Sequence, residues 1–252
     1  PSAVHFVGRP DRFCDAVDLA LSTAEDDGVL ATHGIVPSRP DTGYGYLQSK
    51  PQARSESNGL QVFDVAAFHE KPNREKAEDF IATGNYYWNS GMFFWRIDRF
   101  LAEFERVRPE MADAARAMAE AMANNDKGTV RHIFEGLENI SIDYALMEHA
   151  KKVVVIRADY PWDDVGAWPS LDRTRDHDKD GNVAEGGPVL IDCENCIVYN
   201  EPGAEEIAVS VVGAEDLVVV VSKDGVLVIP KHRAQDVRHA VAELKARGNR
   251  HV

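Results

Sequence analysis

The chain has 252 residues, 44% of them hydrophobic, which is enough for a substantial core and suits one large domain or two small ones. Its formal net charge is −14 at pH 7, so most of its surface repels nucleic acid and anionic membranes. No apolar run approaches the ~20 residues that cross a bilayer, and the first residues lack the features of a signal peptide. We therefore expect no nucleic-acid partner and no membrane partner.

Three cysteines are present, Cys14, Cys193 and Cys196. An odd and sparse set favours a reducing compartment, so we expect a cytoplasmic protein. Cys193 and Cys196 have the C-x-x-C spacing of some zinc and redox sites. A zinc site needs further Cys or His ligands, and none follows within the next thirty residues. We interpret the pair as small residues on a tight turn between strands.

Hydrophobic periodicity and turn residues predict the elements of the first part of the chain. A helix is expected at 10–25, and a polar loop at 49–59, which contains Ser, Asn, Gly and Pro. The other expected elements are strands at 29–36, 62–68 and 86–97, helices at 74–83, 98–106 and 109–124, a helix with Ser141 as its N-cap, and a buried strand at 152–159. Strands that alternate with helices predict an α/β layer.

The pattern changes after about residue 180. Short Val- and Ile-rich runs follow at close spacing, separated by Gly, Asp, Asn and Glu, which predicts a small all-β unit or a few coils of a β-solenoid. The segment 233–247 is an amphipathic helix with apolar residues on one face. We therefore expect two domains, at 1–178 and 179–252.

Four short patches lie at strand ends, where open α/β sheets bind ligands. In the first, Gly45 lets backbone approach a ligand and Tyr46 supplies a wall. A strand bend with core tyrosines is the simpler account of that patch taken alone. In the second, Glu70 can accept hydrogen bonds from sugar hydroxyls, and Lys71 can hold a phosphate. The alternative there is an exposed ion pair of little energetic value.

The third patch is Asn89, beside Ser and Gly in an otherwise aromatic strand. A buried amide needs a partner, which a sugar hydroxyl or a local bulge would provide. The fourth patch is the adjacent pair Asp163 and Asp164, after a buried strand. Such carboxylates can bind Mg²⁺ together with substrate phosphates, or they can cap a solvated turn.

Taken together and in this order, the patches resemble the mannose-1-phosphate guanylyltransferase family. The similarity covers nearly the whole chain from about residue 10, in the segments GIVPSRPDTGYGYL (34–47), FHEKPNREKAEDFIATGNYYWNSGMFFWR (68–96), SIDYALMEHA (141–150), DYPWDDVGAW (159–168) and DLVVVVSKDGVLVIPKHRAQDVRHAVAELK (216–245). The resemblance implies a Rossmann-like nucleotidyltransferase domain, followed by a small β-helix-like C-terminal unit and a terminal helix.

The resemblance also implies a reaction: GMP is transferred from GTP to mannose 1-phosphate, giving GDP-mannose and pyrophosphate. The implied site residues are Gly45 and Tyr46 at the mannosyl ring, Glu70 and Asn89 at sugar hydroxyls, Lys71 at the sugar phosphate, Asp164 as ligand of the catalytic Mg²⁺, and Asp163 as the residue that orients it. Lys71 and Asp164 would be the catalytic pair. The nucleophile is already a phosphate anion, so positioning and charge neutralisation are the main tasks. The role of Asp143 stays open, and so does the question whether the protein forms a homo-oligomer.

The sequence departs from the family at its start. The family's N-terminal nucleotide-binding part, with a G-x-G-x-R loop, is absent, and Val4 stands where the family has a metal-binding Asp. We therefore expect the chain alone to be inactive. Two alternatives stay open: a catalytically silent sugar-phosphate-binding or regulatory subunit of an active homologue, and a nucleotidyltransferase for another hexose 1-phosphate.

Overall fold

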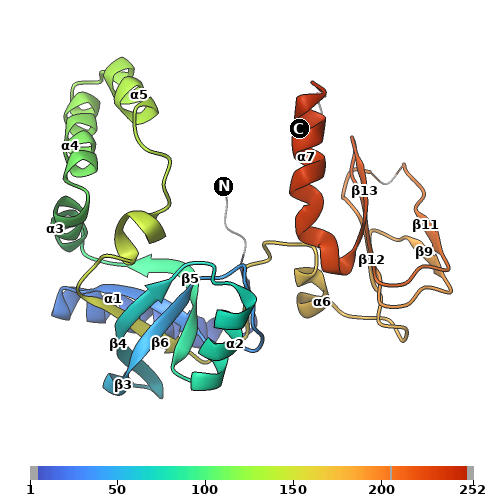
Figure 1. The fold of residues 1–252 in the computed structure, drawn as a ribbon, viewed down its shortest axis with the longest axis horizontal. Helices are drawn as coiled ribbons and strands as arrows, with labels where there is room; N and C mark the ends of the chain where they lie inside the picture. Colours follow the sequence, from blue (N-terminus) through green and yellow to red (C-terminus); the bar gives the residue numbers. More distant parts are fainter. Residues whose placement is uncertain (1–4, 205, 249–252) are drawn as a thin grey trace. The chain divides into compact units, whose positions relative to one another are not determined.

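The computed structural model describes residues 5–204 and 206–248 of the chain, and its ribbon is drawn in Figure 1. The chain divides into two compact units. One is Gly8–Tyr160, and the other joins 5–7 to 161–204 and 206–248. The contacts thus place 161–178 with the β-rich part, and the domain boundary expected between 178 and 179 stays a prediction.

Five strands of the unit Gly8–Tyr160 close into a ring. Around the ring they are β2 (Leu30–Ile35), β5 (Tyr86–Phe94), β3 (Tyr46–Ser57), β4 (Leu60–His69) and β6 (Val153–Ala158). The β2–β6 pair is parallel, and the other four pairs are antiparallel. All of β2 and most of β6 are buried, as is usual for strands that pair in parallel.

Helices complete this unit (Figure 1). Their bounds are α1 (Pro10–Asp27), α2 (Arg74–Thr83), α3 (Ile97–Val107), α4 (Pro109–Ala123), α5 (Lys127–Glu135) and a π-helical turn (Asp143–Met147). Helix α1 starts with Pro10 in its first turn and ends at Gly28, which has a φ of +60°. Helix α2 is capped by the Asn73 side chain and ends at Gly84, also left-handed. Proline in the first turn and glycine just after the last turn are the residues expected at the two ends of a helix.

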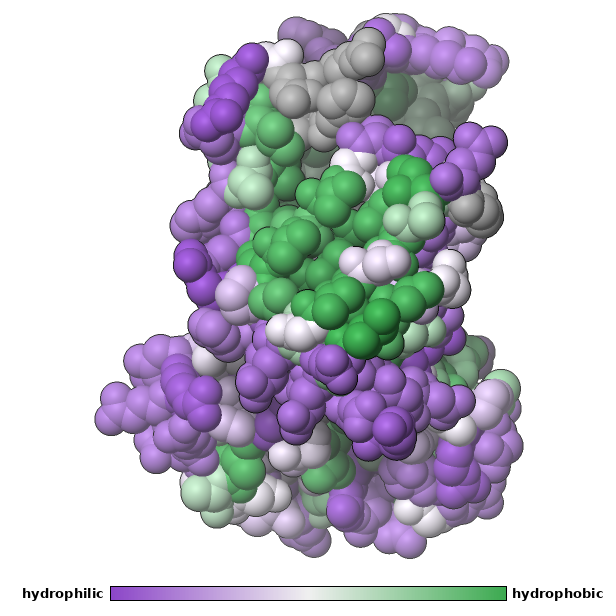
Figure 2. All heavy atoms as spheres, turned by 90° about the vertical axis from the view of Figure 1, so that its right-hand side faces the viewer, coloured by the Kyte–Doolittle hydropathy of each residue, from purple (hydrophilic) through white to green (hydrophobic). Residues whose placement is uncertain are grey.

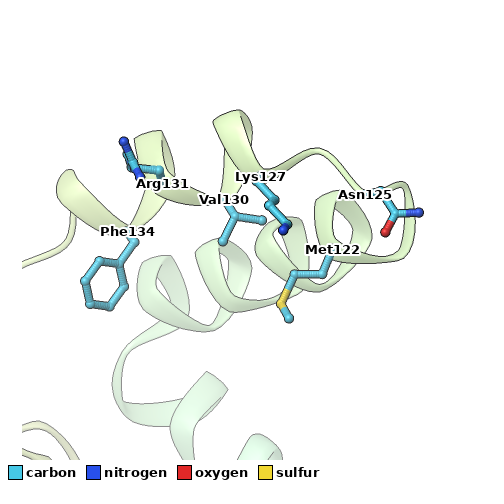
Figure 3. A pocket seen from close by; sticks show the side chains of 6 residues that line it. All are labelled: Met122, Asn125, Lys127, Val130, Arg131 and Phe134. Carbon is cyan, nitrogen blue, oxygen red and sulfur yellow. The ribbon is translucent and has the colours of Figure 1, made fainter.

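Helices α4 and α5 enclose an open hollow of about 470 Å³. Figure 3 shows Met122 of α4 with Val130 and Phe134 of α5 around it, and Lys127 and Arg131 at its rim. Met122 and Phe134 are both about two-thirds exposed, at 67% and 68%. The hollow is therefore a shallow apolar surface of the helical part.

The β-rich unit is built mainly from short parallel strands that stack as coils. One sheet has the order β13 (Val226–Pro230), β12 (Leu217–Val221), β10 (Ile197–Asn200), β8 (Val183–Glu185), and a second pairs β9 (Val189–Ile191) with β11 (Ser210–Val212). The remaining elements are β1 (Phe6–Val7) against β7 (Trp162–Asp163), α6 (Ser170–Thr174), a 3₁₀ turn (Lys231–Asp236) and α7 (Val237–Ala246). The pairs β12–β13 and β1–β7 are antiparallel. The sequence-based expectation of an α/β domain followed by a β-helix-like unit is confirmed.

Cys193 and Cys196 lie inside these coils, packed against Val198 and Val219. The two thiols donate hydrogen bonds to main-chain carbonyls, and neither forms a disulfide. Asn195, between them, has a φ of +53°, which fits a tight turn. The pair therefore serves the packing of the coils.

The β9–β11 pair is apolar on both of its faces. Leu190 and Val211 pack inward, while Val189, Ile191 and Val212 point outward and are 53%, 50% and 64% exposed. From the side on which these strands lie, Figure 2 shows a broad hydrophobic area framed by hydrophilic residues. The polar outer face that is usual for a surface strand is therefore missing here.

Two sequence-based expectations are wrong. The segment 49–59, expected as a polar loop, forms most of β3, because it pairs with β4 as an exposed hairpin. Register shifts between Ser49 and Ser55 accommodate its proline. Ser141 is not the N-cap: Ile142 takes that position, and a π-helical turn follows it. No helix among the residues in view is long and apolar enough to span a membrane.

Candidate sugar-phosphate site

Strand pairing brings three of the four sequence patches together. Tyr46 at the start of β3 pairs with His69 at the end of β4 and with Trp88 in β5, so the residues next to each of them become neighbours. The main-chain amide of Asn89 donates a hydrogen bond of 2.8 Å to the Gly45 carbonyl. Gly45, Glu70 and Asn89 therefore meet, although they are far apart in the sequence.

Gly45 is a glycine because its neighbours leave no room for a side chain. A Cβ built there would collide with Glu70 Oε2 and would lie 3.4 Å from the Asn89 Cβ. The close approach therefore sets the Glu70 carboxylate directly against the backbone of this turn. The sequence-based prediction that Gly45 lets the backbone approach a ligand stays a prediction.

Glu70 and Lys71 form an ion pair with 2.9 Å between Oε1 and Nζ. The Glu70 side chain is only 9% exposed, whereas that of Lys71 is 59% exposed. Burial raises the pKa of Glu70, and Lys71 opposes that rise. The hydrogen bond that Lys71 donates to Glu70 raises the pKa of Lys71. The pair thus presents a cation at the surface, backed by a buried carboxylate.

An open pocket of about 490 Å³ adjoins this pair. Its lining includes Glu70, Lys71, Lys76, Phe80, Glu148 and His149. Two lysines suit an anion such as a phosphate, the carboxylates can accept hydrogen bonds from hydroxyls, and the Phe80 ring offers an apolar wall. The pocket therefore has the groups that a sugar phosphate needs.

Asn89 is buried, and protein groups hold its amide. Nδ2 donates to Asp143 Oδ1 at 2.9 Å, while Oδ1 lies 3.2 Å from both the Thr32 hydroxyl and the Gly91 amide. Sequence reasoning left Asp143 without a role. Its only signal was its place in the segment 141–150, which the resemblance covers.

The Tyr46 side chain is fully buried. Its hydroxyl donates a hydrogen bond of 2.9 Å to the Asp41 main-chain carbonyl, and burial raises the pKa of Tyr46. The ring packs against Phe80. A sugar contact at this position would therefore come from the backbone.

Asp163 and Asp164 belong to the β-rich unit. Asp163 is buried and forms an ion pair of 2.6 Å with Arg173. Burial acts to raise its pKa, but hydrogen bonds from Arg173 and from the Val165 amide outweigh burial and lower it. Asp164 Oδ1 accepts from the Gly166 amide at 3.1 Å. Val165 between them has a φ of +47°, a strained conformation for a β-branched residue that often occurs at functional loops.

No group of three or more His, Cys, Asp or Glu side chains that could hold a metal ion is found in residues 5–204 and 206–248. Asp164 itself offers hard oxygen atoms beside the turn at Gly166. Val4, expected in place of a metal-binding Asp, lies outside the described residues.

Family models identify the chain's class. Residues 5–181 match the model described as Nucleotidyl transferase, and residues 186–244 match the one described as MannoseP isomerase/GMP-like beta-helix domain. The first match covers more than half of the chain. The chain belongs to the nucleotidyl transferase family.

Relatives narrow this further and confirm the resemblance drawn from the sequence. Proteins named mannose-1-phosphate guanylyltransferase from Klebsiella pneumoniae and Escherichia coli (strain K12) are 40% and 41% identical over 97% and 98% of this chain. The chain spans about half the length of these relatives, 51% of each. A crystal structure of mannose-1-phosphate geranyltransferase from Thermus thermophilus superimposes with a TM-score of 0.79 at 33% identity, over 96% of this chain and 67% of that one.

Proposed function

We propose that the protein transfers GMP from GTP to mannose 1-phosphate, giving GDP-mannose and pyrophosphate. The observation that carries this proposal is the Glu70–Lys71 pair at an open pocket, against the backbone of Gly45, in a chain whose relatives have that activity in their names. Cytoplasmic location and the domain boundary between 178 and 179 belong to the same proposal.

The site residues divide the work. Lys71 holds the phosphate of mannose 1-phosphate as a point charge, and Glu70 accepts hydrogen bonds from sugar hydroxyls. A phosphate oxygen attacks the α-phosphorus of GTP, the bond to the β-phosphate oxygen breaks, and pyrophosphate leaves. Because the nucleophile is already an anion, no side chain has to remove a proton, and catalysis depends on positioning and charge neutralisation.

Asp164 would hold Mg²⁺, which commonly takes one or two carboxylates together with substrate phosphates and water. The bound ion would neutralise charge on the phosphates. Asp163 is already paired with Arg173, so we propose that Asp163 does not bind the metal ion itself but holds the loop that carries Asp164 in place.

The sugar-phosphate half of the proposal is tested by the binding of mannose 1-phosphate to the chain. We expect Lys71→Ala to weaken binding about tenfold or more, because it removes a charged phosphate contact. Lys50→Ala is the matched control, since Lys50 is 58% exposed and also faces a carboxylate, Asp64, at 3.7 Å. Equal affinities of the two variants in calorimetric titrations would remove the site assignment.

A second candidate is a sugar-phosphate-binding subunit without catalysis of its own. The observation that favours it is that Glu70, Lys71 and Asn89, the residues proposed to bind the sugar phosphate, are all present. Such a subunit would bind mannose 1-phosphate and co-purify with an active homologue. A third candidate, transfer to another hexose 1-phosphate, is tested by repeating the titration with glucose 1-phosphate.

A further inference from the structure

The hydrogen bonds of Asn89 fix which way its amide points. Asp143 at 2.9 Å is a carboxylate, which accepts and does not donate, so the group facing it must be the Asn89 nitrogen. The Gly91 amide donates on the other side, and the group facing it must be the Asn89 oxygen. The opposite amide orientation would set oxygen against carboxylate and N–H against N–H.

Asp143 is itself held firmly. It is the first residue of the π-helical turn Asp143–Met147, and its main-chain carbonyl accepts a hydrogen bond of 3.0 Å from the Glu148 main-chain amide. Ala145, Leu146 and Met147 in the same turn are buried in the core cluster around Leu30. A π-helical turn is a costly insertion that proteins tend to retain at functional sites. Here it anchors a polar carboxylate on three consecutive core residues.

Asp143 also acts on the ion pair of the pocket. Its negative charge adds to burial in raising the pKa of Glu70, as does the charge of Glu148, and it contributes to the raised pKa of Lys71. These are minor contributions beside burial and the Glu70–Lys71 hydrogen bond. The direct contact of the Asp143 carboxylate is its hydrogen bond with Asn89.

We propose that Asp143 is a positioning residue of the sugar-phosphate site: it orients the Asn89 amide so that the second Nδ2 hydrogen is available to a sugar hydroxyl. With the amide oxygen already directed at Thr32 and Gly91, Asn89 can serve the ligand only as a donor. This inference rests on the proposed function and adds a residue to it that the sequence did not assign.

Affinity for mannose 1-phosphate tests the proposal with three variants of the chain. Asp143→Ala leaves the Asn89 nitrogen without its acceptor, and we expect about tenfold weaker binding. Asp143→Asn keeps an acceptor oxygen at the same place, and we expect affinity within about threefold of the parent chain. Asp113→Ala is the control, since Asp113 is a 75% exposed acid paired with Arg116 on α4, and it should bind like the parent.

A double-mutant cycle separates orientation from a general loss of structure. If Asp143 acts through Asn89, Asn89→Ala combined with Asp143→Ala should bind no more weakly than Asn89→Ala alone, because coupled residues do not add. Additive losses would overturn the proposal. Equal losses for Asp143→Asn and Asp143→Ala would do so as well, since the charge and not the amide orientation would then matter.

Nuclear magnetic resonance provides a readout that does not need the ligand. The side-chain amide signals of Asn89, identified by their loss in Asn89→Ala, should be sharp and alike in the parent and in Asp143→Asn, but shifted or broadened in Asp143→Ala. Unchanged signals in Asp143→Ala would overturn the positioning role. If the parent chain binds no mannose 1-phosphate, the proposed function fails, while these signals still decide whether Asp143 orients Asn89.

Discussion

At the scale of single residues, Gly45 is the position where the site tolerates the least change. A methyl group there would collide with Glu70 Oε2, so the Glu70 carboxylate, which pairs with Lys71, would have to shift. We expect Gly45→Ala to weaken mannose 1-phosphate binding about tenfold or more, as measured by calorimetry.

The control is Gly128→Ala in α5, where the nearest atom to an added Cβ is Asp126 Oδ1 at 3.4 Å. This variant should keep the parent affinity. A Gly45→Ala variant that binds as tightly as the Gly128→Ala variant would show that Glu70 does not need its present place to bind the sugar phosphate.

His33 is a second residue with a measurable consequence. It is fully buried in β2, and its Nδ1 lies 2.8 Å from the Tyr160 hydroxyl. Burial lowers the pKa of His33 to about 4. In the unfolded chain the pKa is about 6.5, so between these two values the unfolded chain binds more protons and the folded state loses stability as the pH falls.

We therefore expect the free energy of unfolding to drop by about 3 kcal/mol from this residue between pH 7 and pH 4. His33→Asn retains a partner for Tyr160 but does not titrate. Its unfolding free energy should be lower at pH 7, because volume is lost, yet should fall less steeply with pH. Urea unfolding at several pH values gives the slopes, and parallel slopes for both proteins would contradict the assignment.

At the scale of elements, helix α2 carries one wall of the site. Its Phe80 stacks on Tyr86 and contacts the rings of Tyr46 and His69. The helix begins where the Asn73 side chain accepts from the Lys76 amide at 3.0 Å. Loss of this cap would weaken the first turn of the helix and loosen the wall.

We expect Asn73→Ala to destabilise the unit by about 1 kcal/mol, the usual value of such a cap. Arg74→Ala serves as the comparison, since its ion pair with Glu78 is exposed on both sides and should be worth less than about 0.5 kcal/mol. Chemical denaturation measures both variants. A larger loss for Arg74→Ala would mean that the cap is not what holds α2.

Helix α2 also shows what sequence can predict at this scale. Its bounds at 74–83 were expected from local signals, a run of helix formers stopped at Gly84, and the structure agrees. The strand β3 was missed because both of its faces are largely exposed, so its residues are polar and carry no alternation. Its existence depends on pairing with β4, which no local pattern contains.

The site follows the same division. Glu70, Lys71, Gly45 and Asn89 were predicted as site residues because their types and order resemble a family. That three of them meet at one point is a result of strand register, Tyr46 against His69 and Trp88. The role of Asp143 could not be predicted, because it depends on a π-helical turn and on the orientation of one amide.

At the scale of the whole molecule, the groups proposed for the sugar phosphate and for the metal belong to two different units. Glu70 and Lys71 belong to Gly8–Tyr160, and Asp164 belongs to the β-rich unit. The 252 residues contain no G-x-G-x-R loop for the triphosphate. We therefore expect the purified chain to bind mannose 1-phosphate but to release no pyrophosphate from GTP, and a coupled pyrophosphate assay that detects turnover would contradict this.

The most direct test of the proposed function is the reaction of the protein made from its complete coding sequence. With GTP, mannose 1-phosphate and Mg²⁺, we expect GDP-mannose and pyrophosphate in equal amounts, and little of either from the Lys71→Ala or Asp164→Ala variant. Failure to form GDP-mannose, or full activity in the Lys71→Ala variant, would contradict the function and the site proposed for this chain.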